Sequence, residues 1–308
     1  MLIVRQEYPH CIEIDAGTGV NAVTFTPNGE YLLCGGYQSV QMWRVKDGER
    51  VATMEAGDVV ECVAVSKDGR FVAAGTNGEV LIWDAENYKQ ILVGKTGGRV
   101  AWNLVRDVDF SSDASRLSQL VSADGSIYTA TVWDAAARQK VQTLDHRGYY
   151  VRAAKYSPQG GRIATITEKF ARVWDSGDGH LLVEVRVEVD PWHGLLWSDN
   201  YLFVKAKESK IREIDAFTGS TVSEWSIPAT DASINIALPQ RGKFVAYSTI
   251  INSTHRKLGF IPWSNEDRPF AFSPSDQLLA VIQHRKVTIR DLSVIKVRPR
   301  MGQDSLLI

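Results

Sequence analysis

The chain repeats one short pattern of bulky and polar positions seven times. In each copy, bulky residues two apart would share one face of a strand, and Pro, Gly, Asn, Asp or Ser follows in a turn in most copies. An apolar segment comes next, such as Tyr31–Cys34 or Phe71–Ala74, and predicts a second strand. No convincing amphipathic helix is found, so the pattern predicts an all-β fold. The seven copies begin at Val23-Thr24-Phe25, Val63-Ala64-Val65, Val108-Asp109-Phe110, Ala154-Lys155-Tyr156, Leu195-Leu196-Trp197, Ile236-Ala237-Leu238 and Phe270-Ala271-Phe272.

A second motif, centred on tryptophan, recurs with the same period as the first pattern. Its clearest copies are Met42-Trp43-Arg44, Ile82-Trp83-Asp84, Val132-Trp133-Asp134 and Val173-Trp174-Asp175. Weaker copies end at Asp215 and Asp291. Apart from the longer step between positions 83 and 133, the spacing is near the period of about 40 to 45 residues that marks a four-stranded propeller blade.

These patterns resemble the WD-repeat family in a divergent form, over roughly residues 12–292. The resemblance implies a single domain, 1–308, folded as a seven-bladed β-propeller of four-stranded antiparallel blades. It also implies that the N-terminal strand, within 8–16, closes the ring in the last blade beside Lys286–Leu292, which would protect the sheet edges. The expected blades are 20–56, 60–95, 105–145, 151–187, 193–227, 234–263, and 268–292 with 8–16. The residues expected to hold the blades together are Trp43, Trp83, Asp84, Trp133, Asp134, Trp174, Asp175, Asp215 and Asp291.

The chain departs from the family pattern at the polar positions that usually stiffen a blade. Many WD repeats have a Gly-His pair before the inner strand and an Asp between the second and third strands, which bond through Ser or Thr to the Trp. No Gly-His pair precedes any of the expected inner strands here. We therefore expect blades held mainly by apolar packing, and a short or deformed sixth blade. The Asp position is occupied instead by Tyr37, Asn77, Glu168, Glu208 and His284.

Composition and charge limit the cellular location and the kinds of partner that we expect for the protein. The 308 residues are 44% hydrophobic and 23% charged with a formal net charge of −1, which suits a soluble globular chain and gives no basic field for nucleic acid. No apolar run is long enough for a signal peptide or a membrane span. The three widely spaced cysteines (Cys11, Cys34 and Cys62) suit a reducing compartment. We expect a cytoplasmic or nuclear protein, monomeric, with no membrane or nucleic-acid partner.

Motifs for catalysis, cofactors or metals are weak. Gly94-Lys95-Thr96 resembles the end of a phosphate-binding loop, but residue 89 is Lys where that motif needs Gly. A Gly-x-Ser-x-Gly nucleophile motif is absent. The histidines lack metal-ligand spacing and are expected mostly at the surface or in turns. The sequence thus predicts no cofactor, no metal and no enzymatic activity. The histidines are His10, His146, His180, His193, His255 and His284.

Aromatic and basic residues gather in the loops that the family places on the top face of the propeller. Trp, Tyr and Arg dominate protein-binding hot spots because they bury a large area and keep a polar group available. The alternative for each aromatic residue is that it folds back to cap the space between blades. The candidate partner-binding residues are Tyr37, Trp102, Arg106, Arg147, Tyr149, Tyr150, Arg152, Trp192, His193, His284 and Arg285.

The leading hypothesis from these residues is a non-catalytic interaction scaffold or sensor domain that binds a protein or peptide on the top face. Binding of a small ligand or carbohydrate by the loop aromatics is an alternative, although it predicts equivalent aromatics in many blades. An enzyme with its site in the central channel is the third hypothesis. It requires titratable groups with perturbed pKa values that converge there.

Overall fold

The computed structural model describes residues 11–95, 104–111, 119–124, 128–189, 195–208, 210–226, 244–246, 249–252, 257–260, 270–275, 277–283 and 285–291. Within these ranges the regular structure is entirely β, and they contain no helix long and apolar enough to cross a membrane. The strands form antiparallel sheets, six with four strands and one with three. The predicted all-β class is confirmed.

We number the sheets along the chain. Sheet 1 contains β2 (Val20–Phe25), β3 (Tyr31–Gly36), β4 (Ser39–Arg44) and β5 (Arg50–Glu55), and sheet 2 contains β6 (Cys62–Val65), β7 (Phe71–Gly75), β8 (Glu79–Asp84) and β9 (Gln90–Lys95). Sheet 3 contains β10 (Val105–Phe110), β11 (Gln119–Asp124), β12 (Thr129–Asp134) and β13 (Gln139–Asp145), and sheet 4 contains β14 (Val151–Tyr156), β15 (Arg162–Thr167), β16 (Phe170–Asp175) and β17 (Leu181–Arg186).

The remaining sheets are less uniform. Sheet 5 contains β18 (Leu195–Ser198), β19 (Tyr201–Ala206), β20 (Lys210–Asp215) and β21 (Thr221–Ser226). Sheet 6 contains β22 (Phe244–Ala246), β23 (Thr249–Asn252) and β24 (Lys257–Phe260). Sheet 7 contains β25 (Phe270–Phe272), β26 (Leu278–Gln283), β27 (Lys286–Asp291) and the N-terminal β1 (Cys11–Asp15). The expected first strand of the sixth blade, Ile236-Ala237-Leu238, lies outside the described residues.

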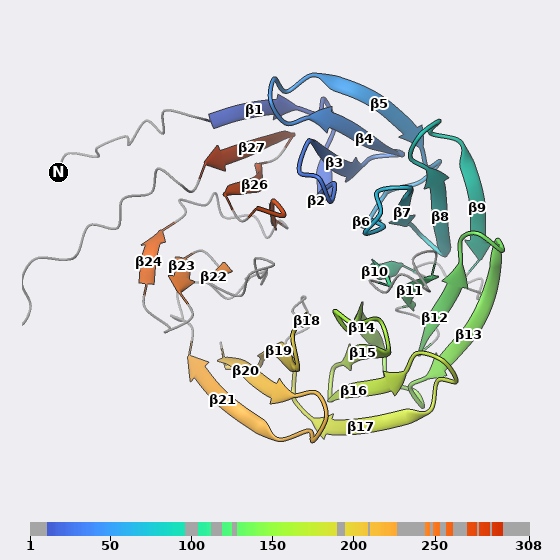
Figure 1. Cartoon of the computed structure of the whole chain (residues 1–308), viewed down its shortest axis with the longest axis vertical. Helices are drawn as coiled ribbons and strands as arrows, with labels where there is room; N and C mark the ends of the chain where they lie inside the picture. Colours follow the sequence, from blue (N-terminus) through green and yellow to red (C-terminus); the bar gives the residue numbers. More distant parts are fainter. Residues whose placement is uncertain are drawn as a thin grey trace, which may run out of the picture.

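The sheets stand around a common centre, which is the arrangement of a β-propeller (Figure 1). In the four-stranded sheets 1 to 5, the first strand of each faces the centre and the fourth lies on the outer edge. The N-terminal strand β1 takes the outer position of sheet 7, where it pairs antiparallel with β27 from Cys11↔Arg290 to Asp15↔Lys286. Sheet 7 therefore joins the two ends of the chain.

Apolar cores fill the spaces between neighbouring sheets. One core combines Leu33 and Met42 of sheet 1 with Val72 of sheet 2, and others link sheets 7 and 1, 2 and 3, 3 and 4, and 4 and 5. The repeated tryptophans lie in these cores, and each packs against the preceding sheet. Trp133, for example, joins Ile82 and Leu92 of sheet 2. Burial of such large rings accounts for their recurrence at one position in the repeat.

The aspartate after the tryptophan shapes the turn between the third and fourth strands. Asp175 Oδ1 accepts hydrogen bonds from the backbone N–H of Gly177 at 2.7 Å and of Asp178 at 3.2 Å. Gly179, at φ 72°, then supplies the left-handed residue that completes the turn. Asp84, Asp134 and Asp215 accept from the equivalent turn amides.

Candidate functional site

One rim of the ring, which we call the top face, gathers two kinds of connection. Because the strands are antiparallel, the turns between second and third strands emerge beside the links from one sheet to the next. Backbone hydrogen bonds tie these segments together, as from His146 N–H to the Tyr128 carbonyl at 2.9 Å and from Val187 N–H to the Lys169 carbonyl at 2.9 Å. In the described residues, the top face is thus built of short loops that hydrogen-bond to one another.

Three tyrosines lie on the top face at the boundary of sheets 3 and 4, and two of them are in contact. The ring centroids of Tyr128 and Tyr150 lie 4.8 Å apart, and their hydroxyl groups are 3.5 Å apart. Tyr150 is 41% exposed. Tyr149 is half-buried and packs edge-on against Phe170, with ring centroids 5.1 Å apart. We call Tyr128, Tyr149 and Tyr150 the tyrosine patch.

Cationic side chains surround the tyrosine patch. The Arg152 guanidinium carbon lies 6.0 Å from the centroid of the Tyr150 ring, and Lys169 Nζ lies 5.6 Å from that of Tyr149. These separations are within the range of cation–π attraction. Burial lowers the pKa of the nearby Arg106, and the positive charge of Arg152 lowers it further, while the carboxylate of Glu61 opposes both.

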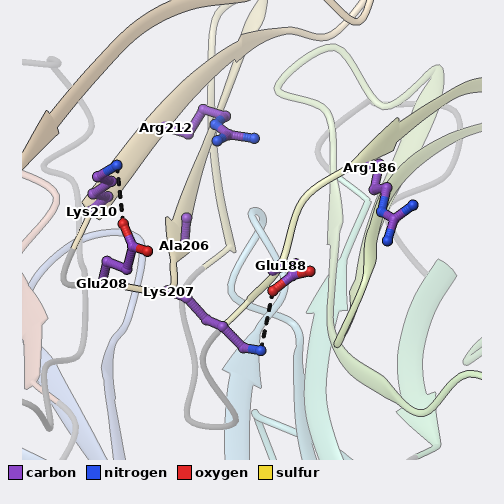
Figure 2. Close-up of a pocket in the computed structure, with 7 residues that line it drawn as sticks. All are labelled: Arg186, Glu188, Ala206, Lys207, Glu208, Lys210 and Arg212. Carbon is purple, nitrogen blue, oxygen red and sulfur yellow. Dashed lines mark hydrogen bonds and ion pairs between the residues drawn. The ribbon is translucent and has the colours of Figure 1, made fainter.

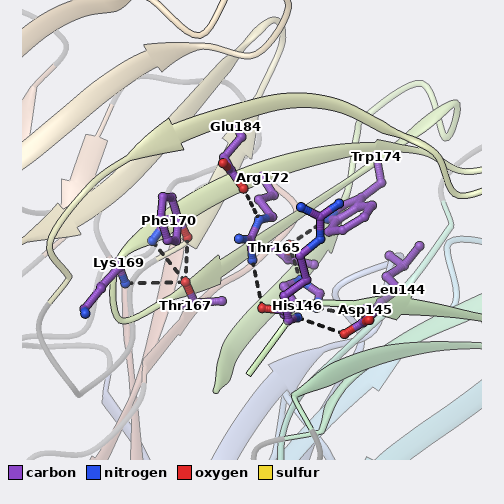
Figure 3. Close-up of polar contacts among 11 residues, drawn as sticks. Leu144, Asp145, His146, Thr165, Thr167, Lys169, Phe170, Arg172, Trp174 and Glu184 are labelled. Atoms are coloured by element: carbon purple, nitrogen blue, oxygen red, sulfur yellow. Dashed lines mark hydrogen bonds and ion pairs between the residues drawn. The ribbon is translucent and has the colours of Figure 1, made fainter. Parts of the chain in front are cut away.

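A buried series of hydrogen bonds lies beside the tyrosine patch (Figure 3). Trp174 Nε1–H donates to Thr165 Oγ1 at 2.8 Å, and His146 Nε2 lies 2.8 Å from the same oxygen. His146 Nδ1 lies 2.9 Å from the Leu144 carbonyl. Since a carbonyl only accepts, Nδ1 carries the proton, and Nε2 accepts from the Thr165 hydroxyl. Burial lowers the pKa of His146 to about 4, and the charge of Arg172 acts in the same direction, so the ring is neutral.

These hydrogen bonds correct one expectation from the sequence. His146 lies in the link between β13 and β14, among the loops where the histidines were expected, but its ring is fully buried. No Gly-His pair precedes β14, yet Asp145-His146 supplies the histidine that bonds through Thr165 to Trp174. Apolar packing is nevertheless the rule in sheet 1, where the Trp43 indole N–H has no hydrogen-bond partner among the described residues.

Charged groups also meet on the inner strands of sheets 3 and 4. Lys155 Nζ donates to Asp107 Oδ1 at 2.8 Å, and the Tyr156 backbone N–H donates to Asp109 Oδ2 at 2.7 Å. Burial raises the pKa of Asp109 to about 6. Burial alone would lower the pKa of Lys155, but the two carboxylates outweigh it and raise that pKa. The paired charges and the bonds to backbone amides give the group a structural role that links β10 to β14.

The structure places the remaining predicted residues as follows. Arg147 is exposed beside the tyrosine patch, in a turn whose backbone N–H bonds to Asp145. Tyr37 is 59% exposed in the turn before β4, and Arg285 is exposed in the turn before β27. Within the described ranges no ring contact, hydrogen bond or ion pair joins these two side chains to the tyrosine patch. Four predicted residues lie outside the described part of the chain: Trp102, Trp192, His193 and His284.

Tyr128 is the member of the patch that is not among the partner-binding residues predicted from the sequence. It stands in a turn of sheet 3 with φ 59°, at a place where the strand pattern is interrupted by the longer repeat. Its partner Tyr150 belongs to the next link along the chain, 22 residues later. Their proximity follows from the pairing of the link with the turn, which spacing alone does not reveal.

Comparison with known proteins identifies the repeat. The family described as "WD domain, G-beta repeat" matches residues 10–44 and 48–84. Each match begins just before or in the outer strand of one sheet and ends in the third strand of the next. Two solved structures share the fold: "Crystal structure of RRP9 WD40 repeats" (TM-score 0.72, 16% identity, 89% of this chain and 94% of that one) and "Structure of U3-55K" (TM-score 0.70, 16% identity, 89% and 96%).

Curated relatives match over shorter segments. The chain is 25% identical over 150 residues to "Ribosome biogenesis protein BOP1 homolog" of Drosophila ananassae, with 48% of this chain and 18% of that protein covered. It is 30% identical over 73 residues to "Small ribosomal subunit protein RACK1" of Caenorhabditis elegans, with 23% and 22% covered. The chain thus spans less than a quarter of the length of these relatives. The matched segments show WD repeats over residues 10–84, and the likeness to the two solved structures shows a β-propeller fold.

Proposed function

We propose that the chain is a non-catalytic scaffold that binds one protein partner through the tyrosine patch on its top face. The observation that carries this proposal is the pair Tyr128 and Tyr150, whose ring centroids lie 4.8 Å apart with Arg152 beside them and with Tyr150 open to solvent. Exposed tyrosine beside arginine is the side-chain chemistry of binding hot spots. The adjacent Arg147 and Arg106 extend the proposed surface.

The uneven distribution of the aromatics favours one asymmetric partner over repeated small ligands. The corresponding turn of sheet 1 carries a tyrosine, Tyr37, but that of sheet 2 carries Asn77 and that of sheet 4 carries Glu168. Among the described residues, a contact between two tyrosine rings occurs at the boundary of sheets 3 and 4. A sugar-binding propeller would need similar stacking rings in several sheets. One named relative is a ribosome biogenesis protein and the other a ribosomal protein, which also supports a binding role inside the cell.

The scaffold proposal includes a shape for the whole chain: seven blades in one closed ring, formed by residues 1–308 as a single domain. The pairing of β1 with β27 supports closure, and the three strands of sheet 6 support a reduced sixth blade. A closed ring leaves the top face as a rigid platform, and loops on rigid scaffolds commonly carry binding residues. It also needs no second copy to cover a sheet edge, which supports a monomer.

The test of the binding proposal is capture of partners from native extract with the intact chain and two variants. The double variant Tyr128→Ala/Tyr150→Ala removes both rings of this pair. Tyr88→Ala is the matched control, because Tyr88 is 38% exposed in a turn on the opposite rim. All three proteins are first shown to unfold at similar denaturant concentration. We expect a protein retained by the intact chain and the control to be lost by the double variant; equal capture by all three would contradict the proposal.

A further inference from the structure

A second top-face feature is a cavity between sheets 4 and 5 that the tyrosine patch does not include (Figure 2). Its volume is about 340 Å³, and Ala206 contributes to its lining. One wall is the end of β17 with the link that follows it, and the other is the turn between β19 and β20. The walls are held together by the Lys207 N–H bond to the Glu188 carbonyl at 2.9 Å and by the bridge between Val189 and Ala206.

The cavity lining carries more positive than negative charge. Four cations face two carboxylates: Arg186, Lys207, Lys210 and Arg212 against Glu188 and Glu208. Three of the cations are already paired. Lys207 Nζ lies 3.2 Å from Glu188, Lys210 Nζ lies 3.3 Å from Glu208, and Arg212 is bonded at 2.8 Å to Glu224.

Arg186 differs from the other three cations. It is exposed at the end of β17, across the cavity from Lys210 and Arg212, and no ion pair joins it to a carboxylate in the described part of the chain. Its planar guanidinium presents several donors in a fixed geometry that suits two oxygens of one anion. The pair between Lys207 and Glu188 is exposed, with both side chains 57% accessible, so an incoming anion can replace the glutamate at little cost.

We propose that this cavity binds one compact anionic side chain, a phosphate monoester or a carboxylate, from a protein partner. Arg186 makes the primary contact, and Lys207 turns from Glu188 towards the same anion. The flanking carboxylates disfavour an extended polyanion such as RNA, whose neighbouring phosphates would meet Glu188, Glu208 and Glu224. The lining also has no aromatic ring on which a base could stack. This assignment adds a class of ligand to the proposed scaffold function. It rests on that function only because the anion is taken to belong to a protein partner.

The experiment measures binding of fluorescein-labelled peptides Gly-Ser-Gly-X-Gly-Ser-Gly, where X is phosphoserine, glutamate or serine, by anisotropy at low ionic strength. We expect the phosphoserine or glutamate peptide to bind the intact chain and the serine peptide not to bind. Whichever anionic peptide binds more tightly identifies the source of the charge. Equal affinity for all three peptides, or no binding of either anionic peptide, would overturn the proposal.

Three variants locate the binding. Arg186→Gln is expected to weaken binding about tenfold, the loss typical of a hydrogen bond to a charged group. Glu188→Gln is expected to strengthen binding severalfold, because it frees Lys207 from its competing partner. Arg138→Gln, in a turn on the opposite rim, should leave affinity unchanged. A gain of affinity in Glu188→Gln cannot arise from damage to the fold, so loss of affinity in both cavity variants contradicts the assignment.

Two further results separate this inference from its alternatives. If oligouridylate competes at far lower concentration than the phosphoserine peptide, the ligand class is wrong and the cavity is a nucleic-acid contact. Peptide binding should persist in Tyr128→Ala/Tyr150→Ala, since the tyrosine patch lies at the boundary of sheets 3 and 4. Failure of the peptide test therefore leaves the tyrosine-patch proposal intact, and failure of the partner capture leaves the cavity proposal intact.

Discussion

His146 makes the bond through a threonine to tryptophan without a glycine before it. Its place is held by the bond from its backbone N–H to the Tyr128 carbonyl. The sequence reveals a histidine in a loop and, separately, a threonine on a strand. The bond between them depends on the pairing of β14 with β15, so residue types alone do not predict it. The same limit applies to Tyr128 and Tyr150.

The first prediction concerns the hydroxyl at the centre of these hydrogen bonds. Thr165→Val keeps the shape of the side chain but leaves the Trp174 indole N–H and the His146 ring nitrogen without their shared partner. Stability should fall by about 1 to 3 kcal/mol, the cost of buried groups left without a hydrogen bond. Urea unfolding at pH 7 measures this. Thr24→Val, on the partly exposed strand β2, serves as the control and should change stability far less.

A pH prediction follows from Asp109 and His146, whose effects oppose each other. The pKa of Asp109 rises on folding from 3.8 to about 6, so the folded state binds the extra proton and stability falls as pH rises through that window. The pKa of His146 falls on folding from 6.5 to about 4, so stability rises with pH between those values. In the intact chain the two slopes partly cancel.

Asp109→Asn removes the contribution of Asp109 to the pH dependence of stability, and it retains an oxygen that can accept a hydrogen bond from the Tyr156 N–H. The stability of this variant should therefore rise more steeply than that of the intact chain between about pH 4 and pH 6, by a total of about 1 to 3 kcal/mol. Denaturant unfolding at intervals across this range gives the two curves. Parallel curves would show that Asp109 titrates in the folded state as it does in the unfolded chain.

At the scale of elements, alternation and turn residues predicted most strands, because each strand has one face in an apolar core and ends at a turn with special dihedrals. The tryptophan motif marks the third strand of sheets 1 to 4 as expected. Contacts between sheets were less predictable. In the sequence Gly94 resembles only part of a weak phosphate-binding motif, whereas its position on β9 faces the Trp133 ring of the next sheet.

Gly94→Ala tests that contact between elements. A methyl group at this position would lie 2.7 Å from Trp133 Cζ3, and the indole is buried, with Trp133 4% exposed. Forced overpacking of this kind costs about 1 to 3 kcal/mol. The control is Gly19→Ala, where an added methyl meets nothing within 4 Å. Both variants are compared with the intact chain by thermal and urea unfolding; equal stability of the two would contradict the proposed packing.

At the scale of the whole molecule, the propeller follows from repetition, because each sheet buries its faces only against its neighbours. The period in the sequence therefore predicts the ring, even though the polar stiffening positions have diverged. Repetition does not predict which of the top-face loops binds a partner. Loop side chains take their places from local bonds such as that between Asp145 and the Arg147 amide, which differ from sheet to sheet.

The last prediction concerns the proposed closure of the ring through β1. Removing residues 1–16 would delete the strand that pairs with β27, together with Ile14, which is 1% exposed in the core between sheets 7 and 1. Burial of one isoleucine contributes about 1.5 to 3 kcal/mol. The truncation also removes the bond from the Ala16 N–H to the Arg285 carbonyl and the acceptor of the Gln41 side chain. Stability should therefore fall by several kcal/mol.

A nested truncation distinguishes closure from a general effect of shortening the chain. Removal of residues 1–9 leaves β1 in place and should leave the denaturation midpoint unchanged. Removal of residues 1–16 should lower the midpoint and promote association in size-exclusion chromatography, because the edge of β27 is then open to pairing with other chains. If both truncations unfold like the intact chain, β1 does not carry the closure, and the ring must owe its stability to the cores between the other sheets.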